Sequence, residues 1–273
     1  MADDTQNDKA DEGSGGTAAS SVADQLVNLI LGDLSPGSSL PSEANLAAQF
    51  DVSRLTVREA VKMVAGRGLL ELARGRRAVV REPSGSVFGD FLTTITMHDP
   101  KGIFDIIEVR QALEIQSATL AARRSNRAGI AAIEHALDGM RRAAEEMART
   151  QDAEKEAAER EFHTHDVEFH EALALASGNR MITYLIEAMA VPLRDAFSLS
   201  MRGHEMRGRT PEQTIAAHER ILAFVREGDS RGASQAMRAH LEDAERDARA
   251  VMKARMSDST GSTSGTSGGG QGG

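Results

Sequence analysis

Four residues in the second half of the chain have side chains that could share a divalent metal ion: Asp166, His170, His218 and His240. Asp166 and His170 are four positions apart, so on a helix both project from one face. One carboxylate and three imidazoles suit a transition ion such as Zn²⁺, Ni²⁺ or Mn²⁺. The spacing predicts a metal site inside a helical bundle. Two alternatives stay open: each histidine is an ordinary core or surface residue, or His163, on the helix face of Asp166, takes one of the places.

A second group of residues, within positions 40–81, could bind nucleic acid. Ser42 and Ser53 each stand where a side-chain oxygen can cap the first N–H groups of a helix. Asp51-Val52 suits a turn between the two helices. This order predicts a helix-turn-helix.

The second of these helices has an apolar side and a polar side. The apolar side holds Val57, Ala60, Val61 and Val64 at helical spacing. The residues that we expect to contact DNA lie opposite and on the segment that follows: Arg54, Leu55, Thr56, Arg58, Lys62, Arg74, Arg76 and Arg77. Arginines suit guanine edges or phosphates, and Leu55 suits a thymine methyl group.

Two strand-like segments follow, residues 68–72 and 78–81, around the basic tip Ala73-Arg74-Gly75-Arg76-Arg77. This pattern is typical of a β-hairpin, or wing. Between Val52 and Arg81 eight arginines and lysines accompany two glutamates, whereas the whole chain has a net charge of −9. Such a local reversal of sign indicates a surface that meets phosphates, with a solvated basic helix as the alternative.

The run LPSEANLAAQFDVSRLTVREAVKMVAGRGLLELARGRRAVV resembles the winged helix-turn-helix of GntR-family bacterial transcription regulators. The likeness covers about residues 20–81. It implies that Arg54 and Arg58 contact DNA and that the wing tip enters the minor groove. Ala44 stands where the family usually has an arginine, so the operator sequence of relatives should not be transferred to this chain.

Beyond the wing, Ala, Leu, Met, Glu and Arg dominate and no alternating strand pattern stands out, which indicates a helical domain. We expect helices at about 86–97, 103–126, 129–149, 155–177, 180–202, 211–227 and 229–254. The predicted fold class is mainly α: an N-terminal winged helix-turn-helix with a small β wing, and a C-terminal antiparallel bundle of six or seven helices.

The bundle segment resembles the FCD effector domain of the FadR subfamily. The likeness rests on residues 166–179 and on the surroundings of His218 and His240. It implies that Asp166, His170 and these two histidines bind a divalent metal, zinc in the first place and nickel or manganese as alternatives. A carboxylate effector would complete the coordination.

The helix around Arg110 also matches this subfamily, and the resemblance implies that Arg110 points into the cavity toward the effector. A buried guanidinium would hold a carboxylate by bidentate hydrogen bonds. The alternative is an ordinary Arg110–Glu114 pair on an exposed helix face. His163 and His165 have no counterpart in the pattern and are expected at the surface, and Asn179 is expected to be a helix C-cap.

The two ends of the chain differ from its middle in composition. Residues 1–19 are acidic with almost nothing to bury, and residues 257–273 are rich in Gly, Ser and Thr, so both are expected to be disordered tails. The DNA-binding domain is expected at 20–82 and the effector-binding and dimerisation domain at 83–256. A capping box of Ser21 and Asp24 would open the first helix.

The composition limits the classes of function that the chain can have. The chain has no cysteine, which excludes disulfides and thiolate metal sites, and no apolar run could span a bilayer, so we expect a cytoplasmic protein without a membrane partner. The expected function is a homodimeric transcription regulator, a repressor that a small carboxylate or sugar acid releases from a palindromic operator. No catalytic residues are expected. The alternatives are an architectural DNA-binding dimer and, less favoured, a metal-dependent hydrolase.

Overall fold

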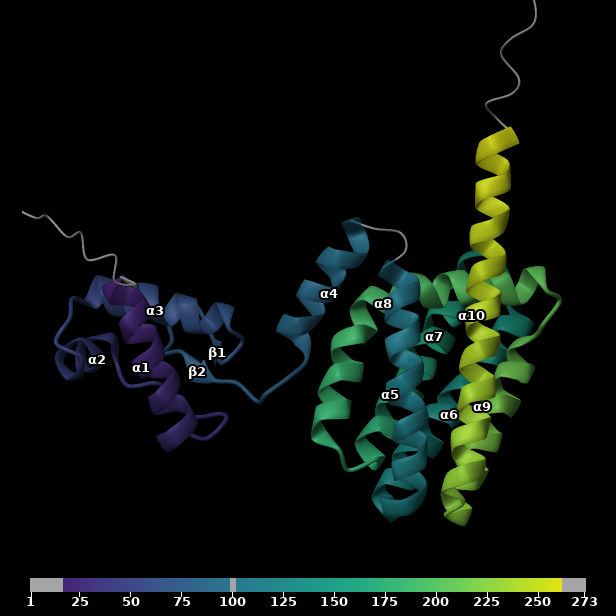
Figure 1. Ribbon diagram of the computed structural model, residues 1–273, viewed down its shortest axis with the longest axis horizontal. Helices are drawn as coiled ribbons and strands as arrows, with labels where there is room; N and C mark the ends of the chain where they lie inside the picture. Colours follow the sequence, from purple (N-terminus) through teal and green to yellow (C-terminus); the bar gives the residue numbers. More distant parts are fainter. Residues whose placement is uncertain (1–16, 99–101, 262–273) are drawn as a thin grey trace, which may run out of the picture. The chain divides into compact units, whose positions relative to one another are not determined.

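The computed structural model describes residues 17–98 and 102–261 (Figure 1). Between Val87 and Phe88 the chain divides into two compact units, each with its own core. The architecture is mainly α with one small two-stranded sheet, which confirms the predicted fold class. No helix in the two described ranges is both long enough and apolar enough to cross a membrane.

In its described part, from residue 17 on, the first unit contains three helices and a hairpin: α1 Ala18–Asp33, α2 Glu43–Gln49, α3 Arg54–Gly66, β1 Leu70–Glu71 and β2 Val79–Val80. The strands pair antiparallel, with Leu70 opposite Val80. Leu26 of α1, Leu46 of α2 and Val57 of α3 are buried in one core. This core holds one side of α3 and leaves the other side to solvent.

Serine side chains cap both helices of the predicted motif. The Ser42 hydroxyl accepts a hydrogen bond from the backbone N–H of Asn45 (3.2 Å), and the Ser53 hydroxyl accepts one from Thr56 (3.1 Å). Asp51 turns the chain between the helices with a φ of +53°, a left-handed conformation that aspartate tolerates. The predicted helix-turn-helix is confirmed.

The first helix begins earlier than predicted. Its N-cap is Thr17, whose hydroxyl accepts a hydrogen bond from the backbone N–H of Ser20 (3.3 Å). The expected capping box of Ser21 and Asp24 is wrong, because both residues lie inside the helix. Residues 18–19 were expected in the N-terminal tail; both are alanines, the strongest helix former, so the helix extends back to the preceding threonine.

The helices of the second unit are α4 Ser86–His98, α5 Gly102–Arg124, α6 Arg127–Arg149, α7 Asp152–Ala176, α8 Arg180–Met206, α9 Pro211–Glu227 and α10 Ser230–Gly261. Helix α9 has the predicted bounds; it starts at a Thr210 capping box and ends at Gly228, which has a left-handed φ of +72°. Helix α10 continues past the predicted end at 254, because the chain after Gly232 contains no further glycine or proline before Gly261. Residues 257–261, expected in the C-terminal tail, are therefore helical, and the rest of both expected tails lies outside the described residues.

The second unit is a bundle with α5 in contact with α7, α8, α9 and α10 (Figure 1). Its main core joins Leu137 of α6, Phe162 and Phe169 of α7, Ile221 of α9 and Met237 of α10, all buried. Because α5 touches four other helices, its side chains reach the centre of the bundle. Polar residues on the inner faces of α5, α7, α9 and α10 are thereby brought together.

Replacing Thr17 with alanine should weaken the start of α1, because the cap of the Ser20 N–H group is lost at a cost of about 1 kcal/mol. Hydrogen exchange of the α1 amides in the full chain measures this loss as faster exchange in the first turn. Ser21→Ala is the matched control, since Ser21 is a helix-interior position where alanine is tolerated with a change of about 0.5 kcal/mol or less. A larger effect at Ser21 than at Thr17 would contradict the observed cap.

Candidate metal centre

The structure brings three of the four predicted ligand residues together, each from a different helix. His170 of α7, His218 of α9 and His240 of α10 have ring nitrogens that all lie within 4.8 Å of one another. His170 Nε2 is 3.4 Å from His218 Nε2 and 3.3 Å from His240 Nε2. Asp166, one turn before His170, lies outside this close group but contacts one member of it: its Oδ1 atom is 3.3 Å from His218 Nε2.

These separations suit a tetrahedral ion. Four ligands at about 2.0–2.1 Å from a zinc ion lie about 3.3–3.4 Å from one another. The two nitrogen–nitrogen distances at His170 and the Asp166–His218 distance all fall in this range. The residues present therefore fit a divalent transition ion.

The outer nitrogens of two of the rings are already engaged. His218 Nδ1 lies 2.8 Å from the carbonyl oxygen of Thr214, which can only accept a hydrogen bond, so Nδ1 carries the proton. His170 Nδ1 contacts the Glu114 carboxylate, which can also only accept, so this contact suits the tautomer with hydrogen on Nδ1. The Nε2 lone pairs of these two rings therefore face each other, and a cation between them would satisfy both.

Burial favours the neutral form of His218 and His240, which is the form that binds a metal. It lowers the pKa of His218 to about 4, although the nearby Asp166 carboxylate raises that pKa. Burial also holds the pKa of His240 well below its usual value, and the charges of His218, His170 and Arg110 act in the same direction. Neutral imidazoles need no deprotonation before they can coordinate.

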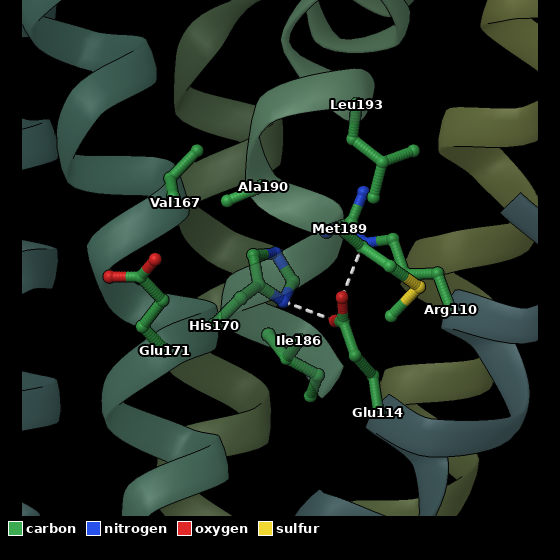
Figure 2. Close-up of a pocket in the computed structure, with 9 residues that line it drawn as sticks. All are labelled: Arg110, Glu114, Val167, His170, Glu171, Ile186, Met189, Ala190 and Leu193. Atoms are coloured by element: carbon green, nitrogen blue, oxygen red, sulfur yellow. Dashed lines mark hydrogen bonds and ion pairs between the residues drawn. The ribbon is translucent and has the colours of Figure 1, made fainter. Parts of the chain in front are cut away.

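Helix α5 places a buried ion pair beside the histidines. The sequence alone did not decide whether Arg110 points into the bundle or pairs with Glu114 on an exposed face. Arg110 and Glu114 are 6% and 2% exposed and contact each other, and Glu114 also contacts His170 (Figure 2). Burial alone would raise the pKa of Glu114, but Arg110 and His170 lower it to about 2. The pair between Arg110 and Glu114 exists, but it lies in the interior and not on an exposed face as the alternative supposed.

Sequence reasoning missed the role of Glu114, the residue that connects Arg110 to His170. Its spacing of four from Arg110 was visible, but this spacing is equally common in surface pairs. The sequence did contain a signal that Glu114 is buried. By helical spacing it shares a face with the apolar residues Ile106, Ile107 and Ala118, and these three are buried in the structure. A carboxylate on the apolar side of a helix points to a buried partner.

A pocket beside the histidines is lined by polar and apolar side chains, and the polar ones are Arg110, Glu114, His170 and Glu171 (Figure 2). The apolar lining comes from α7 and α8: Val167, Ile186, Met189, Ala190 and Leu193. The empty space among these side chains, including the open mouth, is about 270 Å³. The pocket thus combines an arginine, two glutamates, one of the three clustered histidines and a small apolar wall.

Three neighbouring predictions need correction. His163 and His165, expected at the surface, are half-buried, because α6 packs closely on α7: a methyl group at Gly139 would meet the His165 ring. The rings of His163 and His165 lie outside the group formed by His170, His218 and His240. Asn179 is not a C-cap: its side chain accepts hydrogen bonds from the N–H groups of Met181 (3.1 Å) and of the following residue, so it caps the start of α8.

In the first unit, the residues expected to contact DNA lie mainly on the solvent side. Arg54, Leu55, Arg58, Lys62, Arg74, Arg76 and Arg77 are exposed. Four of these arginines line one groove between α2, α3 and the wing: Arg54, Arg58, Arg76 and Arg77. Thr56 is half-buried and its hydroxyl is 2.8 Å from that of Ser53, so it also supports the helix start.

Comparison with known proteins agrees with both units. Residues 18–80 match the family described as bacterial regulatory proteins, gntR family, and residues 105–243 match the FCD domain. This chain belongs to the GntR family of transcription regulators. The pairing of the two domains confirms the predicted resemblance to FadR-like members.

Several GntR-family relatives are similar over most of their length. The chain is 31% identical to the HTH-type transcriptional regulator LutR of Bacillus subtilis over 215 residues, which cover 78% of this chain and 93% of LutR. It is 30% identical to the galactonate operon transcriptional repressor of Escherichia coli over 212 residues, covering 76% and 86%. Among solved structures, a Streptococcus agalactiae GntR protein aligns with a TM-score of 0.60 and 26% identity, covering 84% of this chain and 99% of that one.

Replacing Glu114 with glutamine should destabilise the bundle by about 3–5 kcal/mol, because the buried charge of Arg110 loses its carboxylate partner. Urea unfolding of the full chain, followed by circular dichroism, measures the change. Glu145→Gln is the control, since Glu145 lies in an exposed pair with Arg149 (3.9 Å) and its removal should change stability by about 0.5 kcal/mol or less. Comparable losses in the two variants would mean that the buried pair contributes nothing beyond a surface pair.

Proposed function

We propose that this GntR-family protein is a ligand-responsive repressor that binds a palindromic operator as a homodimer in the cytoplasm. Residues 20–82 would bind DNA, and residues 83–256 would dimerise and bind the effector. The observation that supports the proposal most directly is the buried group of three histidines beside Arg110 and a small pocket. A bundle that served only for dimerisation would not need buried, mutually facing imidazole nitrogens.

Asp166, His170, His218 and His240 are the proposed ligands of a divalent metal, with zinc favoured because it commonly takes imidazole and carboxylate ligands, and nickel or manganese as alternatives. Such an ion would act as a Lewis acid toward a carboxylate oxygen. Glu114 holds His170 through Nδ1, and Thr214 holds His218 in the same way. These outer contacts orient the rings whether or not an effector is present.

The chemistry of the pocket favours an effector that carries a carboxylate. Arg110 and Glu114 balance each other, and Asp166 and Glu171 add two further carboxyl groups, with burial raising the pKa of Glu171. A doubly charged cation would offset these two groups, so the preference for a carboxylate rests on the cation as a Lewis acid and on the guanidinium of Arg110. The planar guanidinium of Arg110 suits a carboxylate, and the apolar wall suits a short carbon chain. A small organic acid or a sugar acid meets this description, and the relative named as a galactonate operon repressor supports it.

The arrangement of α8 supports a route from the pocket toward the DNA-binding unit. Met189 lines the pocket, and the neighbouring Ala188 lies directly against Gly89 of α4, where a methyl group would come within 2.9 Å of the Ala188 carbonyl oxygen. Helix α4 follows the wing after residues 81–85. We propose that an effector that shifts α8 acts on α4 through this contact and thereby changes the separation of the two reading helices in the dimer, which must match half-sites one helical turn apart.

On the DNA, Arg54, Leu55, Thr56 and Arg58 are the proposed major-groove contacts of α3. Lys62 with the wing residues Arg74, Arg76 and Arg77 would contact the backbone or the minor groove. The relatives are transcription regulators, which supports regulation over the alternative of a metal-dependent hydrolase. The architectural alternative differs from the proposal by having no metal and no effector response.

Full-length protein purified without chelator or affinity metal should contain about one divalent ion per chain. His218→Ala combined with His240→Ala should remove it, because two of the four ligands are lost. His163→Ala is the matched control on α7, since His163 lies outside the histidine group, and it should keep the ion. Elemental analysis by mass spectrometry measures all three proteins. An unchanged metal content in the double variant would disprove the site.

Among small organic acids and sugar acids, at least one should stabilise the metal-loaded chain and weaken its binding to operator DNA. At a concentration of a hundred times its Kd the acid should add about 2.7 kcal/mol of stability. Thermal unfolding and fluorescence anisotropy with labelled DNA measure the two effects, and the variant lacking His218 and His240 should show neither. DNA binding without metal or acid response would instead support the architectural alternative.

A further inference from the structure

The proposed reading residue Arg58 is held by a residue of the other helix of the motif. Its Nε donates to Glu43 Oε1 (3.1 Å) and its Nη2 donates to Glu43 Oε2 (2.7 Å). Both side chains are largely exposed, at 56% and 42%. A bidentate contact of this kind fixes the plane of the guanidinium as well as its position.

The contact leaves the end of the guanidinium available. Glu43 occupies the edge formed by Nε and one side of Nη2, so the remaining N–H groups lie on Nη1 and the outer side of Nη2. This end has the fork geometry that can pair with O6 and N7 of guanine. Arg54, on the same face of α3, forms no ion pair among the residues that the structure describes, although its charge helps to lower the pKa of Glu43.

Stability does not account for the Glu43–Arg58 pair. An exposed ion pair contributes about 0–1 kcal/mol to folding. Glu43 also places a negative charge in the groove that the arginines line, next to the uncharged Ala44, where it opposes the approach of phosphates. A carboxylate at this place lowers affinity for DNA of any sequence. The benefit of Glu43 must therefore come from the way it orients the guanidinium of Arg58.

We infer that Glu43 is a positioning residue for specificity: it holds Arg58 so that the free end of the guanidinium meets a guanine edge, and it disfavours contact of Arg58 with the phosphate backbone. This inference rests on the proposed reading of DNA by α3. It makes α2, and not only α3, a determinant of sequence preference. Removing Glu43 should release Arg58 to phosphates, at the expense of base reading.

The test compares two DNA duplexes. One is selected by the wild-type full-length chain from a random library, and the other is a shuffled duplex of the same composition. At one fixed salt concentration, Glu43→Ala should lower the ratio of the two affinities by about tenfold, the value expected for loss of one good bidentate base contact. Affinity for the shuffled duplex should stay the same or rise, because a negative charge has been removed. If Glu43 only supported the fold, Glu43→Ala would instead weaken binding to both duplexes by the same factor.

A double-mutant cycle assigns the effect to Arg58. In an Arg58→Ala background, Glu43→Ala should change the affinity ratio by less than about twofold. The control is Asp24→Ala, since Asp24 forms an exposed pair of the same kind with Arg67 (2.9 Å) at the far end of α3, and it should leave the ratio unchanged. Thermal unfolding verifies that all variants are folded.

The outcomes separate this inference from the proposed function. If Arg58→Ala lowers the ratio and Glu43→Ala does not, the positioning role is overturned while α3 remains the reading helix. If Arg58→Ala itself leaves the ratio unchanged, the proposed reading by α3 is overturned as well. Equal effects of Glu43→Ala with and without Arg58 would also overturn the positioning role, since Glu43 would then act through another group.

Discussion

The interior of the helical unit buries an arginine, two carboxylates and three imidazoles in contact with one another, and the rest of that unit is arranged around the need to balance them. Glu114 touches both Arg110 and His170, so the ion pair and the histidine group form one connected network. Buried charge is tolerated only where each group has a partner. Four helices, α5, α7, α9 and α10, must therefore keep fixed positions relative to one another, and the apolar core around Phe169 and Ile221 provides that rigidity.

The DNA-binding unit follows the opposite principle. Its charged residues lie at the surface, where water solvates their charges. The apolar side of α3 packs into the core, and the opposite side does not. Serine caps and the left-handed Asp51 define the angle between α2 and α3. The same angle brings Glu43 to Arg58. Local backbone chemistry thus determines the geometry of a surface that has few tertiary contacts of its own.

Much of this architecture could be predicted because it is encoded locally. The caps at Ser42 and Ser53, the glycine at the end of α9 and the i,i+4 pair of Asp166 and His170 each depend on neighbours within a few residues. The errors arose where tertiary context decides. A pair spaced like Arg110 and Glu114 looks the same whether exposed or buried, and only the packing of α5 against four helices buries it. Asn179 can end one helix or begin the next, and its N–H partners in α8 decide for the latter.

The short connection between α9 and α10 has a consequence for how this chain can change in evolution. His218 and His240 come from the two arms of one helical hairpin, joined by Gly228 and Asp229. One inserted residue in α10 before His240 would rotate the imidazole by about 100° around the helix and carry it away from the other two. The length of the connection between α6 and α7 is not restricted in this way, since none of the three clustered histidines comes from α6. Length variation among homologues should therefore accumulate near residue 150 and be rare between positions 218 and 240, so insertion patterns alone would separate relatives that keep the histidine group from those that have lost it.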